Sequence, residues 1–174
     1  MSRGAAADGP GIAPLVSVSV RLARVLGAAA DADREFVASL GRRTAMASVG
    51  TMRSAPERMV QGAFDRLLDL VENQSHLTFI AEVDGAPAGF LLLLDALPDE
   101  VTALPQGFVA YMAIEPRRRR EGIGAALLAA AEDEARSRGL PYMALMVTEE
   151  NEAARRLYER GGYRTERRLL CKTL

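Results

Sequence analysis

Residues 110–124 of the chain read AYMAIEPRRRREGIG, and this stretch decides the predicted fold. An apolar run with the character of a buried strand stops at Pro116, and four consecutive arginines follow. Gly122 and Gly124 then open an amphipathic helix predicted for residues 122–138. The amides in the first turn of a helix are unpaired and carry a partial positive charge, and glycines let an anion approach them closely. The stretch therefore predicts a phosphate-bearing ligand at a helix N-terminus. The alternative is a helix that merely begins beside solvated arginines.

Two other phosphate-binding motifs are excluded by the residues that follow. A dinucleotide fingerprint requires a third glycine at the position of Leu127. A P-loop requires a lysine directly after its last glycine, and the one lysine of the chain is Lys172. The arginine-rich loop thus belongs to neither class.

Outward from this stretch, strands and helices are interleaved. Residues 90–94 are apolar at every position, which indicates a strand buried on both faces and hence helices on both sides of a sheet. Asp31 or Asp33 is predicted to cap the first helix. The fold class is therefore α/β (α+β), with a mixed sheet. Strands are expected at residues 16–20, 78–83, 88–94, 107–114 and 142–147, with one or two more in residues 163–174, and a loop at 95–106.

Length and composition indicate one ordinary globular domain. The chain has 174 residues, 49% of them hydrophobic, with 22 basic and 23 acidic side chains. We expect a flexible tail at residues 1–14, rich in Gly, Ala and Pro, and a single domain at residues 15–174.

The near-zero net charge argues against a nucleic-acid-binding protein. A single cysteine, Cys171, and a single histidine, His76, exclude an internal disulfide and a Cys/His zinc site, and no metal is expected. No apolar run suggests a membrane span or a secretory signal, so a cytoplasmic protein without membrane partners is expected.

A second segment, residues 151–163, reads NEAARRLYERGGY and follows a predicted strand. Together with residues 119–124 it resembles the GNAT superfamily of N-acetyltransferases. The first family signature is Gln/Arg-x-x-Gly-x-Gly/Ala, and the second is Asn-x-x-Ala-x-x-Leu-Tyr-x-x-x-Gly-Phe. The matching residues are Arg119, Gly122 and Gly124 in the first, and Asn151, Ala154, Leu157, Tyr158, Gly162 and Tyr163 in the second, with Tyr163 in place of Phe.

The resemblance implies the GNAT fold: a mostly antiparallel sheet of about six to seven strands, helices on both faces, and a slot where the fourth and fifth strands splay apart. It also implies that acetyl-CoA lies in this slot as co-substrate. The implied cofactor-binding residues are Met112, Ala113, Ile114, Arg119, Arg120, Glu121, Gly122, Ile123, Gly124, Ala125, Asn151 and Tyr158. Leu157 and Tyr163 are assigned to packing, and the last residues look like the final strand of the family.

The implied activity is transfer of an acetyl group to a primary amine of a small molecule or peptide, by direct attack in a ternary complex. Tyr158 is the catalytic residue, the acid that protonates the leaving thiolate; the competing interpretation is an aromatic core residue. A glutamate that some family members place in the fifth strand is replaced by Met146. The base is therefore left open among Tyr111, Glu82, Glu149 and water.

The alternative function is a catalytically silent domain that senses acetyl-CoA or CoA, and a phosphate-ligand domain unrelated to CoA comes third. Substrate specificity is expected in residues 40–57 and 95–106, where charges of both signs leave the acceptor undecided. A homodimer is also left open.

Overall fold

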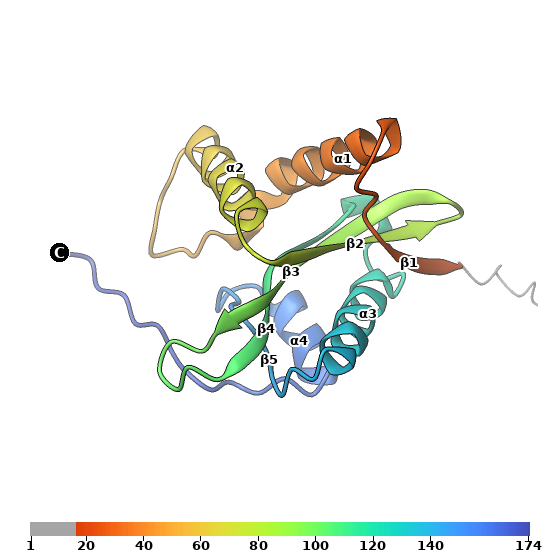
Figure 1. Cartoon of the computed structure of the whole chain (residues 1–174). Coiled ribbons are helices and arrows are strands. Elements are labelled where there is room, and N and C mark those ends of the chain that lie inside the picture. Colours follow the sequence, from red (N-terminus) through yellow and green to blue (C-terminus); the bar gives the residue numbers. More distant parts are fainter. Residues whose placement is uncertain (1–16) are drawn as a thin grey trace, which may run out of the picture.

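The computed structural model describes residues 17–174, and in these residues five strands form one sheet in the order β1-β2-β3-β4-β5 (Figure 1). Neighbouring strands run antiparallel except β5, which runs parallel to β4. The expectation of six to seven strands is corrected to five within the described part of the chain. The strands are β1 (Val18–Leu22), β2 (His76–Val83), β3 (Ala86–Pro98), β4 (Pro105–Ile114) and β5 (Met143–Leu145). The helices are α1 (Ala28–Thr44), α2 (Glu57–Glu72), α3 (Ile123–Ser137) and α4 (Glu152–Arg160), with the 3₁₀ turns η1 (Ala45–Ser48) and η2 (Pro116–Arg118).

Helices cover both faces of the sheet, as the apolar run at residues 90–94 predicts. Helices α1 and α2 lie on one face, and α3 and α4 lie on the other (Figure 1). Along β3, Phe90, Leu92 and Leu94 pack into the core under α1 and α2, whereas Leu91 and Leu93 pack into the core under α3. None of these five side chains is more than 4% exposed. The mixed α/β fold class is confirmed.

The β3–β4 hairpin is longer than expected. A loop is predicted over residues 95–106, but β3 continues to Pro98 and β4 begins at Pro105, so the loop is only residues 99–104. Leu97 pairs with Gln106, and Pro98 pairs with Pro105. A proline lacks an amide hydrogen but is tolerated at the end of a strand, which explains why the two prolines flank the loop instead of lying inside it.

The C-terminal residues form no strand in the structure, which corrects a second expectation. Residues 163–174 have neither helix nor strand, and Leu169, Leu170 and Leu174 are exposed. Strand β5 is only three residues long, against six expected, and so offers little backbone for a further strand. The segment is held instead by Arg167, whose guanidinium binds Asp99 at 2.6 Å and Glu100 at 3.1 Å.

The N-terminal part differs from expectation in one contact. The predicted tail at residues 1–14, like Val16 of the predicted first strand, lies outside the described residues. Helix α1 begins at Ala28, so neither predicted aspartate caps it. Asp33 is instead buried and accepts hydrogen bonds from the Arg21 guanidinium at 2.7 and 2.8 Å, an ion pair that lowers the pKa of its carboxyl group.

Among residues 17–174, no helix combines the length and the apolar character needed to cross a bilayer.

Candidate functional site

Strands β4 and β5 diverge after a short parallel contact. Residues Gly107, Phe108 and Val109 pair with Met143, Ala144 and Leu145, and there the pairing ends, although β4 continues to Ile114. On the other edge of β4, Val109 pairs with Leu93 and Tyr111 with Leu92, so Ala110 is an extra residue. Such a bulge bends the strand that carries it, and here it coincides with the last residue paired to β5. The predicted splay between the fourth and fifth strands is thus present in this chain.

Past the bulge, β4 has an open backbone edge. Met112, Ala113 and Ile114 pair with β3, but no described strand flanks them on the β5 side. In an antiparallel ladder, successive residues direct their N–H and C=O groups alternately to one neighbour and to the other. Every second residue of this segment therefore offers both groups to whatever lies in the slot, and an extended amide-containing chain could pair with them as a strand does.

The loop after β4 leads these backbone groups to a helix N-terminus. The Glu115 amide donates to the Ala88 carbonyl at 2.8 Å, which fixes the start of the loop, and η2 follows. Arg120 and Gly122 both take the left-handed conformation, at φ 72° and 81°. No hydrogen bond between described residues is donated by the backbone amides of residues 120–125. The segment from Arg120 into the first turn of α3 can therefore bind an anion through several amides at once.

The side chains around this segment are mostly solvated. Arg117, Arg119 and Arg120 are exposed, and Arg118 pairs with Glu121 at 3.4 Å. Ile123 is buried in the core below α3 and can offer a ligand only its amide. The arginine run thus adds positive charge beside the helix N-terminus without forming a rigid side-chain cage.

Gly124 has a packing role that the sequence does not reveal. A Cβ at this position would lie 2.8 Å from Cδ2 of Leu157 and 3.1 Å from Cδ1 of Ile114. The first turn of α3, the end of β4 and helix α4 therefore meet at this glycine. Leu157, assigned to packing from the sequence, is the residue that packs α4 against the predicted phosphate-binding turn at residues 119–125.

Helix α4 carries the two remaining predicted site residues. Asn151 caps the helix, because its Oδ1 accepts a hydrogen bond from the Ala154 amide at 3.2 Å. Its Nδ2 makes no hydrogen bond with the described residues and is free to donate to a ligand. Tyr158 is partly buried, and its ring meets that of Tyr163 edge to face at 5.9 Å between centroids. Burial raises the pKa of the Tyr158 hydroxyl, so this group stays protonated at neutral pH.

The order of these parts, from a bulged strand through a turn with free amides to a capped helix with a tyrosine, matches a known family. Residues 50–163 match the model of the acetyltransferase (GNAT) family. The chain belongs to the GNAT family. An uncharacterized N-acetyltransferase from Bacillus subtilis, YhfO, is 33% identical over 104 residues, which are 60% of this chain and 69% of that protein.

Solved structures show the same fold. A putative acetyl transferase from Pyrococcus furiosus superposes with a TM-score of 0.74 at 21% identity, over 91% of this chain and all of that one. An aminoglycoside N-acetyltransferase, AAC(6')-Iy, in complex with CoA superposes with a TM-score of 0.63 at 17% identity, over 94% of this chain and 99% of that one. The family match and the Bacillus subtilis relative place the present chain among acetyltransferase enzymes.

The candidates for the base in this GNAT chain lie in three different settings. Glu82 lies on β2, which is separated from β5 by two strands, and accepts a hydrogen bond from Arg21 at 2.6 Å. Tyr111 is on β4, with its ring 4.8 Å from that of Phe64 in the core under α1 and α2. Glu149 is exposed and pairs with Arg155 at 3.1 Å. Among the described residues, none of these groups forms a hydrogen bond with Tyr158.

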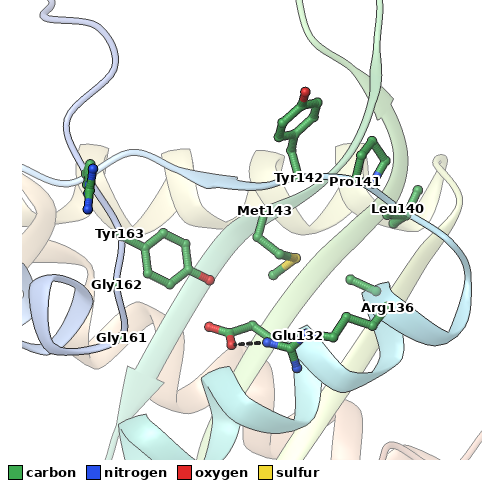
Figure 2. A pocket seen from close by; sticks show the side chains of 11 residues that line it. Glu132, Arg136, Leu140, Pro141, Tyr142, Met143, Gly161, Gly162 and Tyr163 are labelled. Carbon is green, nitrogen blue, oxygen red and sulfur yellow. Dashed lines mark hydrogen bonds and ion pairs between the residues drawn. The ribbon is translucent and has the colours of Figure 1, made fainter.

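One hollow in the described part of the chain lies apart from the predicted slot. A cavity of about 410 Å³ lies between the second half of α3, the start of β5 and the residues after α4 (Figure 2). It is lined by Tyr142, Met143 and Tyr163 and by the Glu132–Arg136 ion pair, which measures 3.0 Å. None of the predicted cofactor residues lines it.

Among the described residues, no cluster of His, Cys, Asp or Glu could hold a metal ion.

Proposed function

We propose that this GNAT chain transfers an acetyl group from acetyl-CoA to a primary amine of a small molecule or peptide, by direct attack in a ternary complex. The observation that carries the proposal is the succession of two backbone segments with unpaired groups, the open edge of β4 at residues 112–114 and the free amides of residues 120–125. One end suits an extended amide chain, and the other suits a diphosphate. CoA joins these two groups in this order.

The residues present fit such a donor. Met112 and Ile114 lie on the open edge of β4, where backbone pairing would hold the pantetheine arm. The turn from Arg119 to Ala125 would hold the diphosphate, and no atom lies within 4 Å of where a Cβ of Gly122 would stand. The Nδ2 of Asn151, free of other hydrogen bonds, can donate to the arm from the opposite bank.

The chemistry requires that the amine nitrogen attack the acetyl carbonyl, so that a C–N bond forms and the C–S bond breaks. Acetyl-CoA supplies the activated thioester. A backbone N–H on the open edge of β4 can stabilise the charge that develops on the carbonyl oxygen, a contribution of about 2.7–4 kcal/mol per donor in comparable sites. Holding both reactants in line lowers the barrier further.

Tyr158 protonates the departing thiolate in this proposal. An ordinary phenol has a pKa of ~10 and a thiol ~8.5, so the transfer is mildly uphill in solution. Burial raises the pKa of Tyr158 and keeps its proton in place until the sulfur becomes negative. The amine must also lose a proton, and the acceptor of that proton is left open among Tyr111, Glu82, Glu149 and water.

A domain that binds CoA without catalysis is the second candidate, and the absence of a positioned base among the described residues favours it. Calorimetry with CoA tests the binding site, and thiol release from acetyl-CoA with a panel of polyamines, amino acids, aminoglycosides and peptides tests the reaction. We expect saturable CoA binding and thiol release with at least one amine. Binding without any release would support the silent domain, and no binding would overturn both.

A further inference from the structure

Helix α4 ends in a pattern of backbone hydrogen bonds that fixes the residue after it. The Gly162 amide donates to the Glu159 carbonyl at 3.1 Å, and the Tyr163 amide donates to the Tyr158 carbonyl at 3.0 Å. Gly162 takes the left-handed conformation, at φ 87°. These bonds and this φ define a Schellman motif, in which the residue after the left-handed position often packs on the side chain five residues before it. The backbone itself therefore directs Tyr163 to Tyr158.

The two tyrosine rings make the contact that this motif predicts. Their centroids lie 5.9 Å apart and their planes meet at 62°, an edge-to-face arrangement. The Tyr163 ring is folded back over the end of α4, since a Cβ at Gly161 would lie 3.4 Å from its Cδ2 and 3.5 Å from its Cε2. Edge-to-face pairs of aromatic rings are attractive beyond the area that they bury. The contact therefore favours one orientation of the Tyr158 ring.

No polar contact between described residues holds the Tyr158 side chain. The side-chain hydrogen bonds of α4 involve Asn151 and two arginines, and none of them involves the Tyr158 hydroxyl. Leu157 fixes the helix itself through its contact with Gly124. Tyr158 borders the core under α3, but no residue of α4 is fully buried. The direction of the Tyr158 hydroxyl thus depends on ring packing.

Tyr163 acts on Tyr158 through its ring and not through its hydroxyl. Figure 2 shows the Tyr163 hydroxyl directed into the hollow, toward Glu132 on α3 and Met143 on β5. The hydroxyl oxygen is buried and makes no hydrogen bond with the described residues. Burial and the Glu132 carboxylate raise the pKa of this hydroxyl, so it is neutral at ordinary pH. The far end of the ring is thereby enclosed between a helix and a strand.

We propose that Tyr163 is a positioning residue, whose ring, set in place by the turn at Gly162, holds the Tyr158 side chain in the orientation that protonates the departing thiolate. This inference rests on the proposed acetyl transfer and on the role of Tyr158 in it. Tyr163 itself takes no part in the transfer. The second family signature has phenylalanine at this position, which supplies the same ring, so the Tyr163 hydroxyl is dispensable for this role.

Tyr163→Leu in the full chain removes the ring, and Tyr163→Phe keeps it. Thiol release from acetyl-CoA gives kcat, with the amine of the panel above that the parent chain turns over fastest. We expect the leucine variant to lose ~10-fold or more in kcat, as misplacing a reacting group does, and the phenylalanine variant to retain the parent's kcat. Calorimetry should show a far smaller change in CoA affinity. The matched control is Tyr142→Leu, because Tyr142 lines the same hollow but is 56% exposed.

The decisive measurement repeats Tyr163→Leu in a Tyr158→Phe background. Residues that act as a unit have effects that do not add. If Tyr163 acts by orienting the Tyr158 hydroxyl, its removal costs nothing further once that hydroxyl is gone, so kcat should equal that of Tyr158→Phe alone. A residue that only supports the fold would lower kcat by the same factor in both backgrounds.

A second pair of variants moves the Tyr163 backbone without removing its ring. Helix α3 ends in the same motif, because the Gly139 amide donates to the Arg136 carbonyl and the Leu140 amide to the Ala135 carbonyl, both at 3.0 Å, with Gly139 at φ 72°. No atom lies within 4 Å of a Cβ at Gly139 or Gly162, so alanine adds only backbone strain at either position. Gly162→Ala should lower kcat by about threefold or more, and Gly139→Ala should not. Thermal unfolding verifies that each variant folds, and this pair carries the test if Tyr163→Leu does not fold.

Three results would overturn the positioning role of Tyr163: an unaltered kcat in Tyr163→Leu, a loss that Tyr163→Phe shares, or an equal loss in the Tyr158→Phe background. Equal effects of alanine at Gly162 and Gly139 would do the same. In each case CoA binding and amine turnover by the parent chain would still uphold the proposed function. Absence of CoA binding or of any thiol release in the parent chain would overturn both.

Discussion

Replacing Gly41 by alanine should destabilise the protein, although alanine is the better helix former. Gly41 lies in the last turns of α1, and a Cβ there would stand under 3.0 Å from Cζ, Cε1 and Cε2 of Phe64 on α2. The Phe64 ring is 3% exposed and rests on the rings of Tyr111 and Phe90, at centroid distances of 4.8 and 6.4 Å. It has no free space into which to retreat, and Tyr111 belongs to the part of β4 that borders the slot.

The magnitude follows from two opposing contributions. Overpacking costs ~1–3 kcal/mol, and three close contacts with a confined ring place this site at the upper end. The gain in helix propensity from glycine to alanine is ~1 kcal/mol. The net loss in free energy of unfolding is then about 2 kcal/mol, which lowers Tm by ~4–8 °C in a chain of this length.

A matched control is available one helix away. Gly62 lies within α2, and a Cβ there would contact only Nη1 of Arg66, at an ordinary 3.6 Å. Gly62→Ala should therefore stabilise the protein by ~0.4–1 kcal/mol, the usual effect where the conformation is already compatible. The same substitution is thus expected to have opposite signs at two positions.

Urea unfolding followed by circular dichroism, together with thermal scans, measures both variants. A further variant, Gly41→Ala/Phe64→Leu, removes the ring that the new methyl group meets, and we expect the cycle to show a favourable coupling of ~1 kcal/mol or more. A Gly41→Ala protein as stable as the parent chain would show that α1 and α2 can separate at little cost. That result would refute the assignment of Gly41 to close helix packing.

Three other outcomes are expected. Tyr158→Phe should lower kcat by ~10²-fold or more, as loss of a general acid does, and should lower acetyl-CoA affinity far less; an unaltered kcat would remove Tyr158 from the mechanism. Gly124→Val should weaken CoA binding in calorimetry because its side chain would push Leu157 and α4 away from the diphosphate turn; equal affinity would contradict this packing. Asp33→Ala should cost ~1.5–3 kcal/mol in urea unfolding because the Arg21 guanidinium and the Arg24 amide lose a buried acceptor, while Arg21 keeps its ion pair with Glu82. Since the pKa of Asp33 is lowered on folding, this contribution is present above the carboxyl's ordinary pKa and is lost as pH falls through the lower, folded-state value, so the parent and variant curves should converge in acid.

The parts of the fold that could be predicted depend on short-range patterns. The apolar run at residues 90–94 predicts a strand buried on both faces, and the structure divides its side chains between two cores. Asn151, found through the second family signature, caps helix α4 by a bond to the amide three residues later, which is again a short-range contact. The two prolines at positions 98 and 105 mislead, because they stand at paired strand ends rather than inside a loop. Asp33 also misleads, because a carboxylate near a helix start can cap the helix or bind a distant arginine, and only Arg21 decides between these.

The geometry of the slot depends on contacts that no short pattern contains. The bulge at Ala110 arises from the register of β4 against β3, and the alanine itself is compatible with a regular strand. Gly124 resembles a glycine that exposes amides to a phosphate, yet its missing side chain also makes room for Leu157, on another helix. The extreme case is the pair of hydrogen bonds that join Thr51 to Glu150 and Thr148 to the Ser48 carbonyl, since these residues lie about one hundred positions apart and look like ordinary exposed polar residues in the sequence. Each of these features brings two chain segments into contact, so each becomes visible only when both segments are in place. The turn at residues 119–125, predicted to bind an anion, could be read from local sequence because one short segment supplies all its amides, whereas the splay beside β4 is formed by several segments and required the structure.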